Sequence, residues 1–259
     1  VGSIIEEVKR VVDQGFVEIT LLGQNVNSYH YEEHRFPQLL EEVAQVEGVR
    51  RIRYTSPHPQ DVDEELLTVM RDTPKICNHI HLPVQAGSTE VLERMNRTYT
   101  REGYLRLVET IYQYMPDCGI TTDIIVGFPG ETDAQFRETL SLMKQVRFDN
   151  AFMFKYSARP YTKAVEFEDT VPEEVKSDRL QQVIDLQNQL TLEKNRALIG
   201  STREVLVEKN SKKSDQQWMG RTDDNRVVVF DKNGEMPRDV VPLQIKDAQG
   251  VTLFGEHIH

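Results

Sequence analysis

The stretch Thr121–Thr132, TTDIIVGFPGET, combines residue types that can hold a ligand. Apolar Ile124–Val126 predicts a buried strand, and the two glycines that follow predict a tight turn before a helix. Thr132 and Gln135 have the spacing of a capping box at the start of that helix. Glycine lets the backbone approach a ligand closely, and a helix start offers free N–H groups. The pattern predicts a ligand site at a strand end of an α/β fold, with a tight turn that binds nothing as the alternative.

Cys77, His79 and His81 alternate along another predicted strand, so their side chains are expected on one face. Three such ligands could bind zinc. Inward packing or a hydrogen-bonded polar layer explains the pattern at least as well, and we favour it. The second cysteine, Cys118, is expected to be a core thiol. Two cysteines make no disulfide framework, which favours a reducing, cytoplasmic setting.

Composition limits the class of protein. A chain of 259 residues with 38% hydrophobic residues can bury at least one core and has room for two domains. No apolar run approaches the length of a membrane span, so no membrane partner is expected. The net charge is −11, but residues 200–259 hold nine Lys and Arg against ten Asp and Glu. The acidity therefore lies in the first part and does not exclude binding of nucleic acid elsewhere.

The elements that must position these residues alternate between strands and helices. Strands are predicted at Val17–Leu22, Arg50–Thr55, Lys75–Val84, Ile124–Val126 and Asn150–Ser157. Such alternation predicts a parallel sheet or an incomplete β/α barrel. The chain opens on a predicted helix, so we expect that the strand before this helix, and the loop after that strand, are missing.

The pattern changes in the last third of the chain. A long amphipathic helix is predicted with Pro172 in its first turn and Gly200 past its end. From Ser201, short β runs separated by turn residues predict a small all-β barrel. We expect two domains, 1–199 and 200–259.

Six motifs occur in order along the chain: LLGQNVNSY, YTSPHP, HLPVQAGS, RMNRTYT, TDIIVGFPGET and FKYSARP. Together they resemble the radical S-adenosylmethionine (SAM) methylthiotransferases, most closely the tRNA branch that adds a methylthio group to C2 of isopentenyl-adenosine beside the anticodon. The resemblance covers nearly the whole chain. It implies an incomplete TIM-like β/α barrel of the radical SAM type followed by a TRAM-like RNA-binding barrel, with SAM and tRNA as ligands and a 5′-deoxyadenosyl radical as the reactive species.

The chain departs from this family in one essential respect. The family holds a [4Fe–4S] cluster by three cysteines in a C-x3-C-x2-C loop, and no such triplet occurs here. We therefore expect the C-terminal portion of a longer protein, without catalytic residues or a metal site of its own and inactive by itself, with the clusters in the full-length parent. A second departure is Tyr161, where the family more often has glycine.

The resemblance implies a set of cofactor-binding residues. Gly23, Gln24 and Asn25 would meet the amino group of SAM. Ser56, Gln85 and Arg97 would meet its carboxylate and ribose, with Arg97 as the bidentate carboxylate partner. Asp123, Gly127 and Phe128 would contact the ribose and adenine. Each also has a structural explanation, as a turn former, a surface charge or a strand carboxylate.

Basic residues surround the single tryptophan of the predicted C-terminal barrel. The set is Lys209, Lys212, Lys213, Trp218, Arg221 and Arg226. Cations suit phosphates and an aromatic ring suits an unstacked base, so the set predicts an RNA-binding surface. The alternative is a solvated hairpin with Trp218 in the core.

Two other functions stay open. A ribosomal-protein (aspartate) methylthiotransferase belongs to the same family, but that branch tends to carry Gln-Asp-Thr-Thr where this chain has GQNVNSY. A non-catalytic RNA-binding protein would explain the absent cysteines, yet it would not explain why every motif at the cofactor edge is present.

Overall fold

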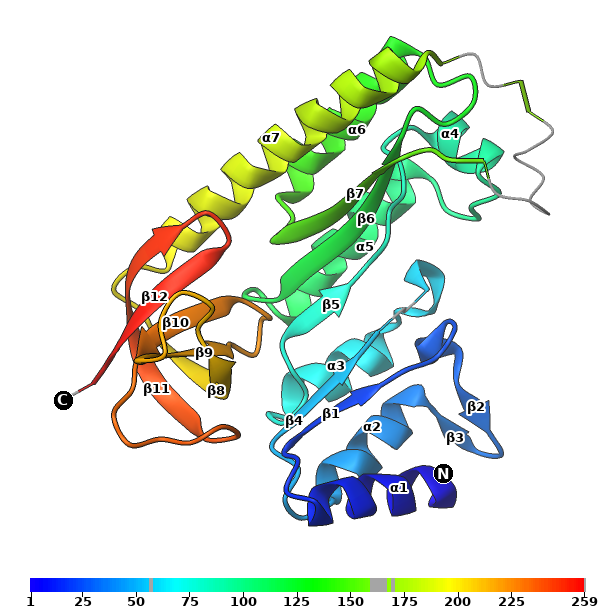
Figure 1. Cartoon of the computed structure of the whole chain (residues 1–259). Coiled ribbons are helices and arrows are strands. Elements are labelled where there is room, and N and C mark those ends of the chain that lie inside the picture. The colour runs from blue at the N-terminus through cyan, green and yellow to red at the C-terminus, as the bar shows by residue number, and fades with distance from the viewer. Residues whose placement is uncertain (56–57, 159–166, 169–170, 259) are drawn as a thin grey trace. The chain divides into compact units, whose positions relative to one another are not determined.

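The computed structural model describes residues 1–55, 58–158, 167–168 and 171–258 (Figure 1). Helices are interspersed with strands up to a long helix, and five strands follow it. Their bounds are α1 Gly2–Asp13, β1 Glu18–Leu21, β2 His30–Tyr31, β3 His34–Arg35, α2 Phe36–Gln45, β4 Arg51–Tyr54, α3 Glu64–Asp72, β5 His79–His81, α4 Thr89–Arg94, α5 Arg101–Tyr114, β6 Gly119–Val126, α6 Asp133–Val146, β7 Asn150–Lys155, α7 Glu173–Ala197, β8 Thr202–Asn210, β9 Gln217–Arg221, β10 Val227–Asp231, β11 Val240–Gln249 and β12 Thr252–His257.

The predicted parallel pairing is confirmed. Strand β1 pairs with β4 in parallel, and β6 pairs with β7 in parallel. Parallel bridges also join Ile52 to Ile76 and Gln85 to Ile124. The strand predicted over Lys75–Val84 is much shorter, because only β5 keeps strand geometry and Pro83 has no amide to donate to a ladder. Among the described residues, no helix combines the length and the apolar composition needed to cross a membrane.

Contacts divide the chain into two compact units, which do not follow the sequence order. The first consists of Val1–Ile80, Ile111–Gly119 and Leu192–His259, and the second of His81–Thr110 and Ile120–Thr191. The boundary predicted near Gly200 stays a prediction from the sequence pattern.

In the first unit, two arginines on one face of β4 contact the C-terminal strands. Arg51 donates to the carbonyl oxygen of Arg221 at 2.6 Å. Arg53 donates to the carbonyl oxygens of Thr222 at 2.8 Å and Asp223 at 3.0 Å. Carbonyl oxygens accept guanidinium donors well, and bonds to a charged group contribute about 1.5–3 kcal/mol each. Strand β4 is therefore attached directly to the turn that follows β9.

The predicted C-terminal barrel is confirmed as a closed sheet in the order β10-β12-β11-β8-β9. Closure removes the unpaired edges that would otherwise promote aggregation. Its core is formed by side chains that alternate inward along the strands: Val205, Val207, Val228, Phe230, Leu243, Ile245, Ala248 and Leu253.

In the second unit, the glycine turn after β6 is closed by a buried carboxylate. Glu131 accepts from the N–H of Gly127 at 2.7 Å and from Arg179 of α7 at 2.9 Å. The Thr132–Gln135 capping box predicted from the sequence is confirmed at the start of α6. Burial raises the pKa of Glu131, and the Gly127 amide and the Arg179 guanidinium oppose that effect without cancelling it.

Replacing Arg179 by alanine would leave the Glu131 carboxylate buried without its cation. We expect Arg179→Ala to lower the free energy of unfolding by about 3–5 kcal/mol at neutral pH. The loss should shrink as the pH falls and Glu131 takes up a proton, because a neutral carboxyl needs no cation. Denaturant unfolding at several pH values measures this. Arg137→Ala, at an exposed arginine of α6, is the control and should change stability by no more than about 0.5 kcal/mol. Equal effects of the two substitutions would contradict this role of Arg179.

Candidate cofactor and RNA sites

The loop after β1 carries the first three predicted cofactor residues. Asn25 has φ of 51°, in the left-handed region that asparagine tolerates better than most residues, and a short 3₁₀ turn, Val26–Ser28, follows it. Gly23 has open space around its α-carbon except for ordinary contact with Val26. The loop therefore turns sharply and presents Gln24 and Asn25 at the end of the strand.

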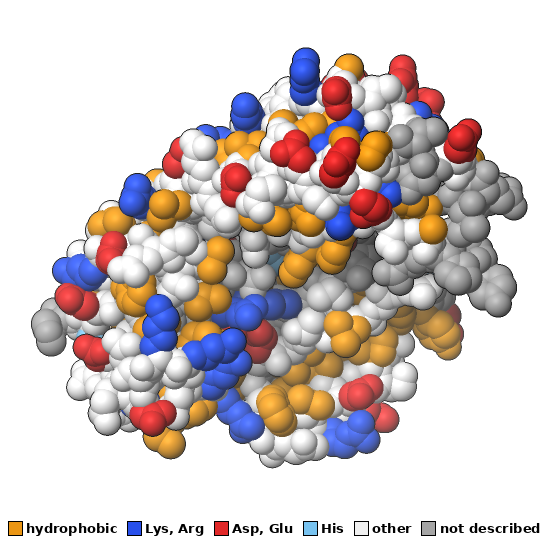
Figure 2. Space-filling view, turned by 45° about the horizontal axis from the view of Figure 1, so that its top comes forward, with side chains coloured by type: hydrophobic (Ala, Val, Ile, Leu, Met, Phe, Trp, Pro, Cys, Tyr) orange, Lys and Arg blue, Asp and Glu red, His pale blue; other side chains and the backbone are white. Residues whose placement is uncertain are grey.

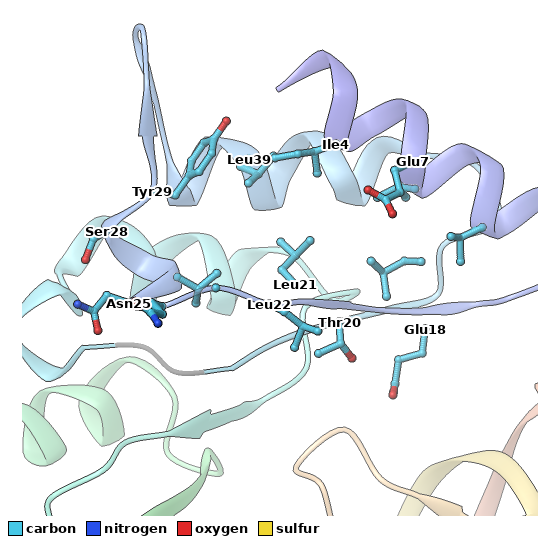
Figure 3. A pocket seen from close by; sticks show the side chains of 16 residues that line it. Ile4, Glu7, Glu18, Thr20, Leu21, Leu22, Asn25, Ser28, Tyr29 and Leu39 are labelled. Atoms are coloured by element: carbon cyan, nitrogen blue, oxygen red, sulfur yellow. The ribbon is translucent and has the colours of Figure 1, made fainter. Parts of the chain in front are cut away.

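A cavity of about 590 Å³ lies beside this loop (Figure 3). Leu21 points toward the helices from which Ile4 and Leu39 come, whereas Thr20 and Glu18 point away from them. The cavity is lined by the apolar side chains of Ile4, Leu21 and Leu39, and also by the loop residues Gly23, Gln24 and Asn25. Its size and mixed lining are typical of small-molecule sites.

Asn27 joins this loop to the next motif, a role that the sequence analysis missed. Its side-chain amide donates to the carbonyl oxygen of His58 at 2.9 Å and accepts from the His58 N–H at 2.7 Å. Two such bonds fix the GQNVNSY loop against the backbone of His58. In the sequence, the only signal was a second asparagine two residues after Asn25. Ser56, the predicted cofactor residue of the YTSPHP motif, lies outside the described residues, as does Tyr161.

The second unit positions Gln85 and Asp123 on neighbouring segments. Gln85 has φ of 71°; its N–H donates to the Asp123 carbonyl oxygen at 2.9 Å, and its carbonyl oxygen accepts from Ile125 at 2.8 Å. The Asp123 carboxylate lies 3.4 Å from Nε2 of His81, whose Nδ1 is 3.0 Å from the Thr121 hydroxyl. The two predicted residues are thus brought together, and His81 joins them.

Arg97 lies in the exposed loop after α4, where its N–H donates to the carbonyl oxygen of Leu92 at 2.8 Å. Burial raises the pKa of Tyr99 to about 12, while the charge of Arg97 lowers it and that of Asp123 raises it. The charges of Arg97 and Asp123 therefore both act on the hydroxyl group of Tyr99. Within the described part of the chain, the Arg97 guanidinium forms no ion pair, which leaves it available to a carboxylate.

The Gly127 amide and the Phe128 ring are both engaged within the protein rather than open to a cofactor. The Gly127 N–H is used by Glu131, and a Cβ at this position would meet Cγ of Lys176 at 2.4 Å. The Phe128 ring is buried and packs edge-on against Tyr156 with a centroid distance of 5.1 Å. Their contact with the cofactor stays a prediction. It is restricted to backbone atoms other than the Gly127 N–H.

The cysteines do not fit an iron–sulfur cluster. Cys77 and Cys118 are both buried, and two thiols cannot supply three ligands. Burial raises the pKa of Cys77 to about 11, which disfavours the thiolate that a metal requires. The zinc alternative is not supported either: Cys77 precedes β5 rather than lying within it, and the described residues contain no cluster of three or more His, Cys, Asp or Glu that could hold a metal.

The predicted RNA residues separate into two groups. Lys209, Lys212 and Lys213 are exposed at the end of β8 and in the loop before β9. Trp218 follows in β9, but its ring packs partly against the barrel core and is covered by Nζ of Lys232 at 3.9 Å from its centroid. The lysines are thus free to meet phosphates, whereas a base could stack on Trp218 only by displacing Lys232.

Arg221 and Arg226 brace the barrel instead. Arg221 pairs with Glu208 at 3.2 Å. Arg226 is almost buried and pairs with Asp224 at 2.7 Å. Burial raises the pKa of Asp224, but Arg226 and a hydroxyl bond outweigh burial and hold it below its usual range. On the face in view in Figure 2, basic side chains gather on the left with acidic ones among them.

Comparison with family models gives two matches. Residues 1–143 match the radical SAM superfamily, and residues 196–258 match the TRAM domain. The first match covers more than half of the chain.

Curated relatives resemble the chain along its whole length. Three are each named tRNA-2-methylthio-N(6)-dimethylallyladenosine synthase: those of Porphyromonas gingivalis, Bacteroides fragilis and Chlorobium limicola are 52%, 51% and 49% identical over 99%, 100% and 98% of this chain. The chain spans only 56–58% of the length of these relatives.

A solved structure shows the same fold. Coproporphyrinogen III oxidase from Escherichia coli, a radical SAM enzyme, has a TM-score of 0.55 with 15% identity, over 85% of this chain and 58% of its own. At that identity the likeness concerns the fold alone, and it agrees with the family match. The chain therefore belongs to the radical SAM superfamily, with a partial α/β fold of that type followed by a five-stranded barrel that matches the TRAM domain.

Proposed function

We propose that this chain is part of a tRNA methylthiotransferase that adds a methylthio group to C2 of N6-dimethylallyladenosine (isopentenyl-adenosine) next to the anticodon. The observation that carries the proposal is the identity of about half of all residues, over 98–100% of the chain, to synthases named for this product. The absence of cluster ligands limits the role of the chain to binding and orientation.

SAM is the cofactor in this proposal, and together with an iron–sulfur cluster it supplies the radical chemistry. The cluster ligands would come from another part of the protein, because Cys77 and Cys118 do not fit them. Asn25 would accept from the amino group of SAM, Arg97 would bind its carboxylate, and Asp123 would accept from a ribose hydroxyl. The free guanidinium of Arg97, the place of Asn25 in the loop after β1, and the half-buried carboxylate of Asp123 within β6 support these roles.

The C-terminal barrel is the part proposed to bind tRNA, in the cytoplasm where tRNA is found. A TRAM match and three exposed lysines at the end of β8 and in the loop after it support this role. The names of the matched relatives favour the tRNA branch over the ribosomal-protein branch. The cofactor-edge motifs argue against a protein that only binds RNA.

A chimera tests the function directly. If this chain replaces the matching C-terminal part of the Porphyromonas gingivalis synthase, the purified and reconstituted chimera should form the methylthio product on prenylated tRNA. Arg97→Ala should raise KM for SAM by about 10- to 100-fold, the loss expected for a bond between two charged groups. Arg137→Ala is the matched control and should change nothing. A soluble chimera that holds its cluster but gives no product would contradict the proposal.

The three free lysines should bind RNA through phosphates. Replacing Lys209, Lys212 and Lys213 by alanine should weaken tRNA binding and reduce the slope of log affinity against log salt by roughly 0.7–0.9 for each phosphate that is no longer neutralised. Binding titrations at several salt concentrations measure the slope. Lys246→Ala, at a lysine paired with Glu256, is the control. An unchanged slope in the triple variant would place the phosphate contacts elsewhere.

Trp218 should act mainly as a structural residue, because Lys232 covers its ring. We expect Trp218→Ala to lower the free energy of unfolding by about 3–5 kcal/mol, as large-to-small core substitutions do. Melting and tRNA binding are measured on the same variant, with binding tested well below its melting temperature. A variant of unchanged stability that binds tRNA about 1–3 kcal/mol less tightly would show that a base stacks on the ring instead.

A further inference from the structure

The sheet of the second unit has two unlike faces. On one face Thr122, Ile124 and Val126 of β6 are fully buried, and Ala151 of β7 is buried with them. Figure 1 shows α6 and α7 running along one side of these strands. On the other face, Asp123 and Ile125 of β6 and Phe152 and Phe154 of β7 keep access to solvent, whereas Thr121 is buried.

This less covered face, which we call the open face, consists of His81, Asp123, Ile125, Phe152 and Phe154. Phe152 and Phe154 have exposed fractions of 55% and 53%, which is unusual for large apolar side chains at neighbouring positions of a strand face. The register sets Asp123 opposite Phe152 and Ile125 opposite Phe154. Together with Ile125, the two rings therefore form an apolar surface next to the Asp123 carboxylate.

The polar edge of the open face is held in place by its neighbours. The ring of His81 lies edge-on to Phe152, with centroids 5.8 Å apart, and its Nε2 is 3.4 Å from the Asp123 carboxylate. None of the five residues is Lys or Arg, and Asp123 repels a phosphate. The open face thus suits an uncharged, partly apolar group rather than the backbone of a nucleic acid.

We propose that Phe152 and Phe154 are specificity-determining residues that contact the dimethylallyl group on N6 of the substrate adenosine. This inference rests on the proposed function. That group is a branched five-carbon chain without polar atoms, so its burial against two rings is favourable. Because Asp123 lies opposite Phe152, a cofactor ribose held by Asp123 would lie next to the substrate base, as their reaction requires.

The test compares two RNA hairpins that differ only in the dimethylallyl group. Wild-type chain should bind the prenylated hairpin at least about tenfold more tightly than the hairpin with plain adenosine, the lower end for an apolar group in an apolar site. In the double variant Phe152→Ala/Phe154→Ala this ratio should fall to about one, while the affinity for the plain hairpin stays the same. The leucine pair Phe152→Leu/Phe154→Leu should keep part of the preference.

Two controls separate the possible failures. Phe16→Ala removes another half-exposed ring, in the first unit, and should leave the ratio unchanged. SAM affinity should also be the same in the double variant and the wild type. An intact preference in the double variant, equal losses for both hairpins, or a loss confined to SAM would overturn the inference and leave the proposed function standing. If wild-type chain binds neither hairpin, the proposed function fails, and this inference fails with it.

Discussion

The second unit depends on one buried carboxylate. Glu131 is nearly inaccessible to solvent, and it holds the glycine turn through the Gly127 amide and the long helix α7 through Arg179. A buried charge is tolerated only when it is paired and hydrogen-bonded, so the turn and the helix must come together for either to be stable. The motif that reads as a ligand loop in the sequence is therefore first a structural device, and its position fixes where β6 ends.

The first unit depends on a second set of charge-assisted bonds. Arg51 and Arg53 project from β4 and donate to carbonyl oxygens of the turn after β9. Gly119 packs so closely on that turn that a Cβ there would lie 2.6 Å from the carbonyl oxygen of Asp224. Through these contacts the C-terminal barrel packs directly on β4 and on Gly119 within the first unit.

Much of the fold was predictable because local patterns determine it. Alternating strands and helices predicted the parallel pairing, and spaced β runs predicted the closed barrel. The site was less predictable. The sequence grouped Arg221 and Arg226 with the free lysines, but their carboxylate partners, Glu208 and Asp224, became visible only in three dimensions. In the same way, Phe152 and Phe154 read as ordinary strand residues, because only the sheet shows which face the helices leave open.

Under the proposed function, this chain serves the methylthiolation of prenylated adenosine in tRNA. Mass spectrometry of nucleosides from total tRNA tests it most directly, in cells with and without the gene that encodes the chain. Deletion is expected to remove 2-methylthio-N6-dimethylallyladenosine, and N6-dimethylallyladenosine should accumulate in its place. An unchanged amount of the methylthio nucleoside after deletion, in cells with no second gene for the same reaction, would contradict it.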